Sequence, residues 1–192
     1  MELDEAQENI RLIRIMMEAG RRNARDNGIQ WVIWGCFGIV VFVFGFFFPR
    51  LQLGKYFPFA VGALYLVVTA LSIFLGRRFA RGRPASFAER AYSALWIGVI
   101  VCIALVMAAF FATKNLPLPV AMAVISAIFG SGVFVSARLT GYSWLIVVAV
   151  LWWAGACALF LMPFMAAAIA FSCLSLALCV VPGLILFLRR RK

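Results

Sequence analysis

Long uninterrupted runs of apolar residues dominate the pattern of hydrophobic and polar positions along the chain. Six such runs occur, at 31–48, 57–75, 91–112, 118–136, 144–162 and 164–188. Each is close to the roughly 20 residues that a helix needs to cross about 30 Å of hydrocarbon. Because the runs contain no Lys, Arg, Asp or Glu, the pattern predicts an all-α membrane protein with six transmembrane helices in three hairpins.

The segment 1–28, before the first run, has a different pattern. Its apolar side chains repeat at steps of three and four residues, which predicts an amphipathic helix with one narrow apolar stripe. The stripe consists of Leu3, Ala6, Ile10, Ile13 and Met17. Either the membrane interface and the ends of the spans cover it, or a partner helix or a second copy of the chain does. The sequence thus divides into an interfacial helix, 1–28, and a transmembrane domain, 29–192.

The basic residues predict how these spans are oriented. Fifteen of the eighteen Lys and Arg residues fall on one side once the six runs are threaded through a bilayer, and only Arg50, Lys55 and Lys114 fall on the other. Basic residues near span ends are retained in the cytoplasm. We therefore expect both termini to be cytoplasmic, in the cytoplasmic (inner) membrane of a bacterium.

The sequence pI of about 10.4 raises the question of what these basic residues bind. The charge is divided among short clusters beside the spans, whereas nucleic-acid binding needs one basic face on a folded domain. We expect contacts with anionic lipid on the cytoplasmic side and no nucleic-acid partner. The candidate contacts are Arg21, Arg22, Arg25, Arg77, Arg78, Arg81 and Arg83.

The titratable residues leave little room for catalysis. Histidine is absent, and Glu89 is the one acidic residue after Asp26. Imidazole-based triads and ordinary zinc sites are therefore excluded, and a charged proton relay inside the membrane has no group to use. The five cysteines all lie within the runs without a C-x-x-C pairing, which is typical of small buried hydrophobes. We expect a non-enzymatic protein with no cofactor and no metal.

Small residues and tryptophans within the runs are the remaining candidates for packing or for lining a cavity. Trp is followed closely by Gly in the first helix of each hairpin, which suggests either a repeat or the ordinary abundance of both residues in membrane helices. Small residues at four-residue spacing in the fourth run predict close helix packing, with a hydroxyl-lined path as the alternative. The candidates are Trp34, Gly35, Trp96, Gly98, Ser126, Gly130, Ser131, Trp153 and Pro182, the last as a kink or hinge.

Several short motifs resemble a family of small bacterial six-span integral membrane proteins whose function is uncharacterised. The motifs are Glu8-Asn9-Ile10, Leu12-Ile13, Met16-Met17, Asp26-Asn27-Gly28, Trp34-Gly35, Gly130 to Gly132, Pro182-Gly183 and the basic tail 189–192. The resemblance implies an N-terminal cytoplasmic amphipathic helix and a regulated membrane response. It supplies no catalytic or binding residue.

Two classes of function follow from these observations. The first is a regulatory or accessory protein that acts through helix packing or a cytoplasmic protein partner, including a second copy of itself. The second is a carrier or channel for a small neutral, apolar or lipid-like molecule. A ligand-sized cavity lined by Ser126, Ser131 and Trp153 favours the second class, and a filled core favours the first.

Overall fold

A computed structural model of the chain describes residues 8, 28–80, 87–113 and 116–189. Within these residues every regular element is helical and no strand occurs. The elements are α2 (Gly28–Arg50), η1 (Gly54–Tyr56), α3 (Phe57–Ala80), α4 (Phe87–Thr113), α5 (Leu118–Thr140), α6 (Trp144–Phe160), α7 (Phe164–Ser175), the π-helical turn η2 (Leu176–Val180) and α8 (Val181–Arg189). The prediction of an all-helical fold is confirmed for this part of the chain.

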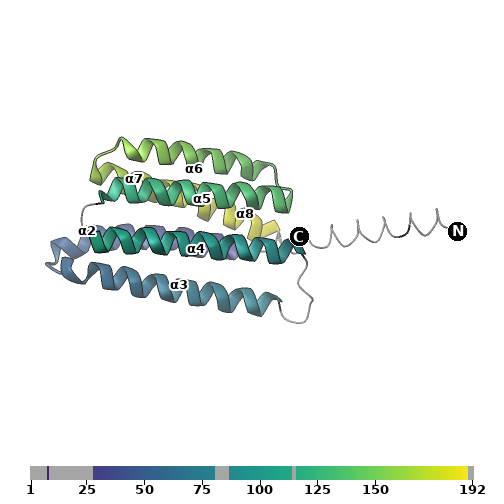
Figure 1. Ribbon diagram of the computed structural model, residues 1–192, viewed down its shortest axis with the longest axis horizontal. Coiled ribbons are helices and arrows are strands. Elements are labelled where there is room, and N and C mark those ends of the chain that lie inside the picture. The colour runs from purple at the N-terminus through teal and green to yellow at the C-terminus, as the bar shows by residue number, and fades with distance from the viewer. Residues whose placement is uncertain (1–7, 9–27, 81–86, 114–115, 190–192) are drawn as a thin grey trace.

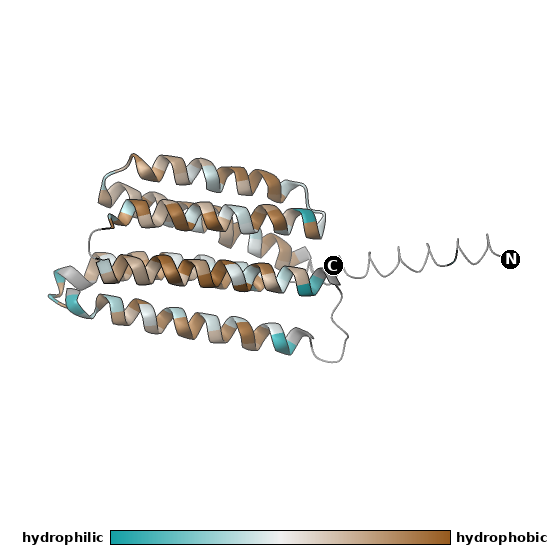
Figure 2. Cartoon of the chain, viewed as in Figure 1, coloured by the Kyte–Doolittle hydropathy of each residue, from teal (hydrophilic) through white to brown (hydrophobic). Residues whose placement is uncertain are grey.

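Five helical stretches among the described residues are long and apolar enough to cross a membrane. They are Gly28–Phe47, Phe57–Arg78, Glu89–Thr113, Leu118–Thr140 and Phe164–Leu188. The remaining apolar helix, α6, has 17 residues. Hydrophilic residues gather at the ends of the helices while hydrophobic residues cover their sides (Figure 2), as expected for helices that contact hydrocarbon along their length.

The helices run side by side along the long axis of the molecule (Figure 1). α5 and α6 form the closest pair, α4 packs on α5, and α2 packs on α3, α7, η2 and α8. The largest fully buried side chains lie on α5 and α6, and they include Trp152, Leu145, Leu159 and Val133. The α5–α6 hairpin is therefore the most tightly packed part of the described bundle.

Local sequence explains both ends of α5. Pro117 stands in an extended conformation before the helix and Pro119 lies in its first turn, where the missing N–H of proline costs no helical hydrogen bond. Gly141 ends the helix with φ 75°, and its N–H bonds to the Ala137 carbonyl at 2.9 Å. This left-handed conformation is one that glycine adopts readily.

The last apolar run leaves α-helical geometry before Pro182. The Val181 N–H bonds to the Leu176 carbonyl five residues back, which is the π-helical pattern. In a regular α-helix the Pro182 ring would collide with the Leu178 carbonyl, and Pro182 has no N–H to offer it. The wider turn relieves this collision, so the departure that the sequence predicted at Pro182 takes the form of a π turn on its N-terminal side.

Candidate functional site

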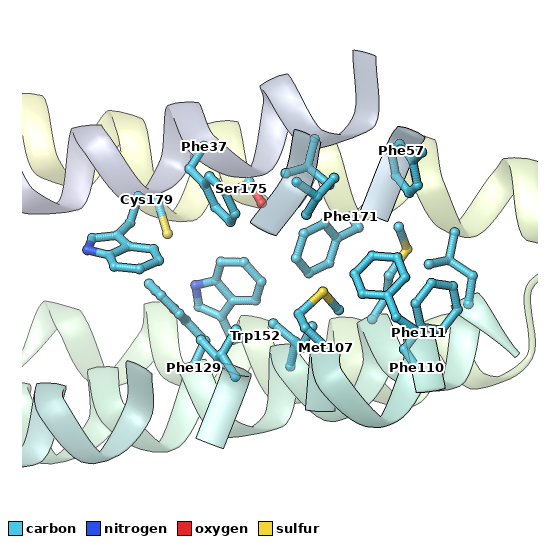
Figure 3. A pocket seen from close by; sticks show the side chains of 17 residues that line it. Phe37, Phe57, Met107, Phe110, Phe111, Phe129, Trp152, Phe171, Ser175 and Cys179 are labelled. Atoms are coloured by element: carbon cyan, nitrogen blue, oxygen red, sulfur yellow. The ribbon is translucent and has the colours of Figure 1, made fainter. Parts of the chain in front are cut away.

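An apolar cavity of about 90 Å³ lies within the helix bundle. Side chains from α2, α3, α4, α5, α6, α7 and η2 line it, and Figure 3 shows them facing one another across it. Nearly all the lining atoms are carbon or sulfur. The arrangement suits an apolar group and offers almost nothing to a polar one.

Two straight rows of side chains on α4 and α5 form one wall. Ile103, Met107 and Phe111 follow one another at four-residue steps along α4. The lining residues of α5 are Leu118, Met122, Ile125 and Phe129. These spacings place each row on one face of its helix. Met107 and Met122 add flexible thioether side chains that fill irregular space and adjust to what they contact.

Aromatic rings from α2, α3 and α6 close the sides of the cavity. The Trp34 ring on α2 packs edge-on against Phe37 and against Tyr65 of α3, with centroids 5.7 and 5.6 Å apart. The Trp152 ring on α6 lies 5.1 Å from that of Phe129. Trp152 is 2% exposed, and its indole N–H has no hydrogen-bond partner among the described residues.

The π turn supplies the wall opposite α4. Phe171 and Ser175 reach the cavity from α7, and Cys179 reaches it from η2 (Figure 3). A side-chain Cβ on Gly35 of α2 would lie 2.7 Å from Val180 Cγ2 and 2.9 Å from Cys179 Cβ. Glycine at position 35 therefore permits the close approach of α2 that brings the π turn to the cavity.

A layer of aromatic and polar side chains covers one end of the cavity. Trp31 on α2 donates its indole N–H to the Tyr92 hydroxyl on α4 at 3.2 Å. Trp96, one turn further along α4, donates to the Ser136 hydroxyl on α5 at 3.1 Å. The Trp96 ring also lies 5.2 Å from that of Phe129, the last lining residue of α5. Trp31, Tyr92 and Ser136 are all buried, so this end is packed.

The residues predicted from the sequence fall in different places. Trp34 lines the cavity, and Gly35 lies beside it at the η2 contact. Trp96 belongs to the covering layer. Pro182 is buried in the first turn of α8, which follows η2. Gly98 faces outward, and a Cβ there would meet no atom within 4 Å, so the close helix contact expected at Gly98 is not made within the described chain.

The polar stretch of α5 does not line the cavity. Ser126 is fully buried, and its hydroxyl has no partner among the described residues. Ser131 is exposed and donates to the Ala127 carbonyl of its own helix at 3.0 Å. Trp153 lies at the outer surface over Gly130 and donates to the same carbonyl at 3.3 Å. Ser126, Ser131 and Trp153 therefore lie in the packing of the α5–α6 pair, and among the described residues they do not form the hydroxyl-lined path that was the alternative to close helix packing.

The basic candidates are only partly described. Arg77 and Arg78 are exposed in the last turn of α3. Arg21, Arg22, Arg25, Arg81 and Arg83 lie outside the described residues, as does the predicted amphipathic helix apart from Glu8 and Gly28.

The cavity residues that sequence reasoning missed include Trp152, Met107, Phe129 and Cys179. The sequence held one signal for these residues, which is that the cavity-lining residues of α4 and of α5 each repeat at helical intervals. In a helix that is apolar on every side, other faces show the same spacing, so the signal does not single out the cavity face.

The described part of the chain contains no group of three or more His, Cys, Asp or Glu side chains that could hold a metal ion. Cys36, Cys102, Cys157 and Cys173 are exposed on the helix surfaces, and Cys179 is buried at the cavity wall. Comparison with protein-family models, with curated proteins and with solved structures found no match to this chain.

Proposed function

We propose that this chain is a non-enzymatic membrane protein that binds, and as a carrier moves, a small apolar molecule or the apolar chain of a larger one. The observation that carries the proposal is the cavity of about 90 Å³ to which α2–α7 and η2 all contribute side chains. Of the two classes considered from the sequence, a filled core would have favoured the regulatory or accessory role. The cavity is lined by residues other than Ser126, Ser131 and Trp153, but the apolar space it leaves in the core supports the carrier role.

The size and lining of the cavity limit what it accepts. An apolar cavity of about 150 Å³ in a protein core stays dry and takes up benzene or xenon. The present cavity is smaller, at about 90 Å³, so it suits an atom such as xenon, a methyl-terminated group or a stretch of a single alkyl chain. A polar solute would lose its hydration there without gaining hydrogen bonds.

The proposal includes six spans with both termini in the cytoplasm of a bacterial cell. Five stretches have the required length and hydropathy, and α6, with 17 residues, is at the lower end of the range for a spanning helix. α6 packs along α5 and α7, and three residues connect it to α5. An α6 that crosses the bilayer antiparallel to α5 fits these contacts. The resemblance to the family of small bacterial six-span proteins supports the same topology.

The basic side chains at the proposed cytoplasmic face fit anionic lipid as the surrounding partner. Arg77 and Arg78 extend from the end of α3 and are exposed. Each basic residue close to an anionic membrane surface contributes roughly 1 kcal/mol of attraction. We propose no nucleic-acid partner, no cofactor and no metal.

Xenon binding tests whether the cavity accepts an apolar guest. The purified protein in nanodiscs is titrated with xenon and followed by xenon nuclear magnetic resonance. Ile103→Phe fills the cavity from α4, because Ile103 is 6% exposed and lines it. Val101→Phe is the matched control, since Val101 is 50% exposed on another face of α4. We expect saturable binding to the parent and the control and none to Ile103→Phe. Equal binding to all three proteins, or to none, overturns the proposal.

A further inference from the structure

The cavity is elongated along the helix axes. Its lining row on α5 runs from Leu118 to Phe129, and eleven residues at about 1.5 Å each span roughly 16 Å. Half of the hydrocarbon core of a bilayer measures about 15 Å. The lining of the cavity along α5 thus extends over about the thickness of one membrane leaflet, and its side chains follow one another along that direction in Figure 3.

The two ends of this elongated cavity differ. Beyond Phe129 stands the packed layer formed by Trp31, Tyr92, Trp96 and Ser136. At the other end the lining residues are Phe57, Phe111 and Leu118, which belong to the first turn of α3, the last turns of α4 and the first turn of α5. A guest that lies along the cavity therefore has its buried end at Trp152 and Trp34 and its outer end near the start of α3.

Positive charge stands at that outer end. Lys55 lies in η1, two residues before Phe57, and its ammonium is 5.0 Å from the centroid of the Tyr56 ring. Arg50 ends α2, with its guanidinium 3.6 Å from the centroid of the Phe46 ring. Both side chains are exposed. The sequence has no Asp or Glu between Asp26 and Glu89, so no carboxylate of the adjoining chain neutralises them.

We infer that the ligand is a single-chain amphiphile with an anionic head, whose chain occupies the cavity and whose head binds Lys55 and Arg50. The inference rests on the proposed function and names its ligand class. A cavity of about 90 Å³ takes up a stretch of one alkyl chain, whereas a sterol or a pair of chains is too bulky for it. In the proposed orientation the head lies at the outer surface, so the amphiphile enters from the outer leaflet.

Quenching of indole fluorescence by bromine tests the position of the chain. The probes are twelve-carbon carboxylates with bromine at the far end of the chain or next to the head, added to the full chain in nanodiscs of zwitterionic lipid. We expect the far-end bromine to quench more strongly, because Trp152 and Trp34 lie at the buried end of the cavity. Trp152→Phe should remove part of this difference and Ile103→Phe all of it. Equal quenching by the two probes overturns the assigned chain direction.

The head is tested with three probes of the same chain length that carry carboxylate, hydroxyl or trimethylammonium. A phosphate monoester of that chain length shows whether the site prefers a carboxylate or a phosphate head. We expect the carboxylate to bind about tenfold more tightly than the alcohol. The double variant Lys55→Gln/Arg50→Gln should abolish this preference. Arg138→Gln, at the opposite end of the bundle, should leave it unchanged.

The outcomes separate the two proposals. If the alcohol binds as tightly as the carboxylate, or if the double variant keeps the preference, the anionic head is wrong while the apolar site stands. If no chain probe binds and xenon binding is absent as well, both the ligand class and the proposed function fail.

Discussion

Trp96 on α4 donates its indole N–H to the hydroxyl of Ser136 on α5, with 3.1 Å between nitrogen and oxygen. Ser136 is 1% exposed, so water cannot replace it as the acceptor. The bond joins two helices at the layer that covers one end of the cavity.

Replacing Ser136 by Ala should therefore leave the Trp96 N–H unpaired in an apolar interior. We expect a loss of about 1 kcal/mol in the free energy of unfolding, the size typical of hydrogen bonds between membrane helices. Ser131→Ala on the same helix is the control, because the Ser131 hydroxyl is exposed and bonds only within α5. Denaturant titration in mild detergent measures both. Equal stability of the two variants would show that this hydrogen bond does not stabilise the packing of α4 on α5.

Gly183→Ala should destabilise the packing of α2 against α8. A Cβ at position 183 would lie 2.8 Å from the Gly28 carbonyl oxygen and 2.9 Å from the Trp31 Cβ. The contact is with backbone, so α2 and α8 must separate, and overpacking of this kind costs about 1–3 kcal/mol.

Gly98→Ala is the matched control for that substitution. Nothing lies within 4 Å of its added Cβ, and Ala favours the helix over Gly by up to about 1 kcal/mol. We expect the midpoint temperature of thermal unfolding to fall for Gly183→Ala and to stay the same or rise for Gly98→Ala. A fall for both would indicate that position 98 contacts another molecule.

Tyr65→Phe should loosen the contact between α3 and α4. The Tyr65 hydroxyl donates to the Ile100 carbonyl at 2.5 Å, and removal of that hydroxyl should lower the free energy of unfolding by about 1 kcal/mol. Tyr56→Phe removes the same group from a half-exposed ring and should change nothing. Denaturant unfolding curves of the two variants in the same detergent test this prediction. An unchanged curve for Tyr65→Phe would show that the Tyr65 hydroxyl does not stabilise the contact between α3 and α4.

The topology prediction is checked with a reporter enzyme that is active only outside the cytoplasm. We expect activity when the reporter follows Lys114 and none when it follows Arg83, because fifteen of the eighteen basic residues would then lie inside. The reverse pattern would show that the protein has the opposite orientation in the membrane. Activity at both positions would show that both lie outside the cytoplasm, so that no span separates them.

The arginines of segment 1–28 should bind anionic lipid. A peptide of this segment in which Arg21, Arg22 and Arg25 are Gln should bind anionic liposomes more than tenfold less tightly than the parent peptide. Zwitterionic liposomes serve as the control surface. Unchanged binding to the anionic liposomes would exclude these arginines as lipid contacts.

The sequence predicted the helices well and their ends less well. The apolar run that stops at Ser136 continues as α5 to Thr140, because Arg138 interrupts the hydropathy but not the helix. A long arginine side chain reaches the interface from a helix that remains intact. The physical end is Gly141, whose left-handed conformation becomes visible only in the backbone.

The cavity lay beyond sequence reasoning for a related reason. Trp153 was singled out by its spacing from Gly155, yet it lies at the surface, and its neighbour Trp152 is 2% exposed and lines the cavity. Successive residues on an α-helix point about 100° apart, so one position decides between lipid and interior. Helix α6 has no polar residue from Trp144 to Phe160, and nothing in its composition marks the inward side.

The distribution of thiols described above gives the molecule a native reporter. Four of its five cysteines are exposed on the helix surfaces, and the fifth, Cys179, is buried at the cavity wall. Alanine at the four exposed positions leaves Cys179 as the one thiol of the chain. The rate at which a small membrane-permeant alkylating reagent modifies Cys179 then measures how often the bundle opens, and a resident chain would slow that reaction by occupying the space in front of it.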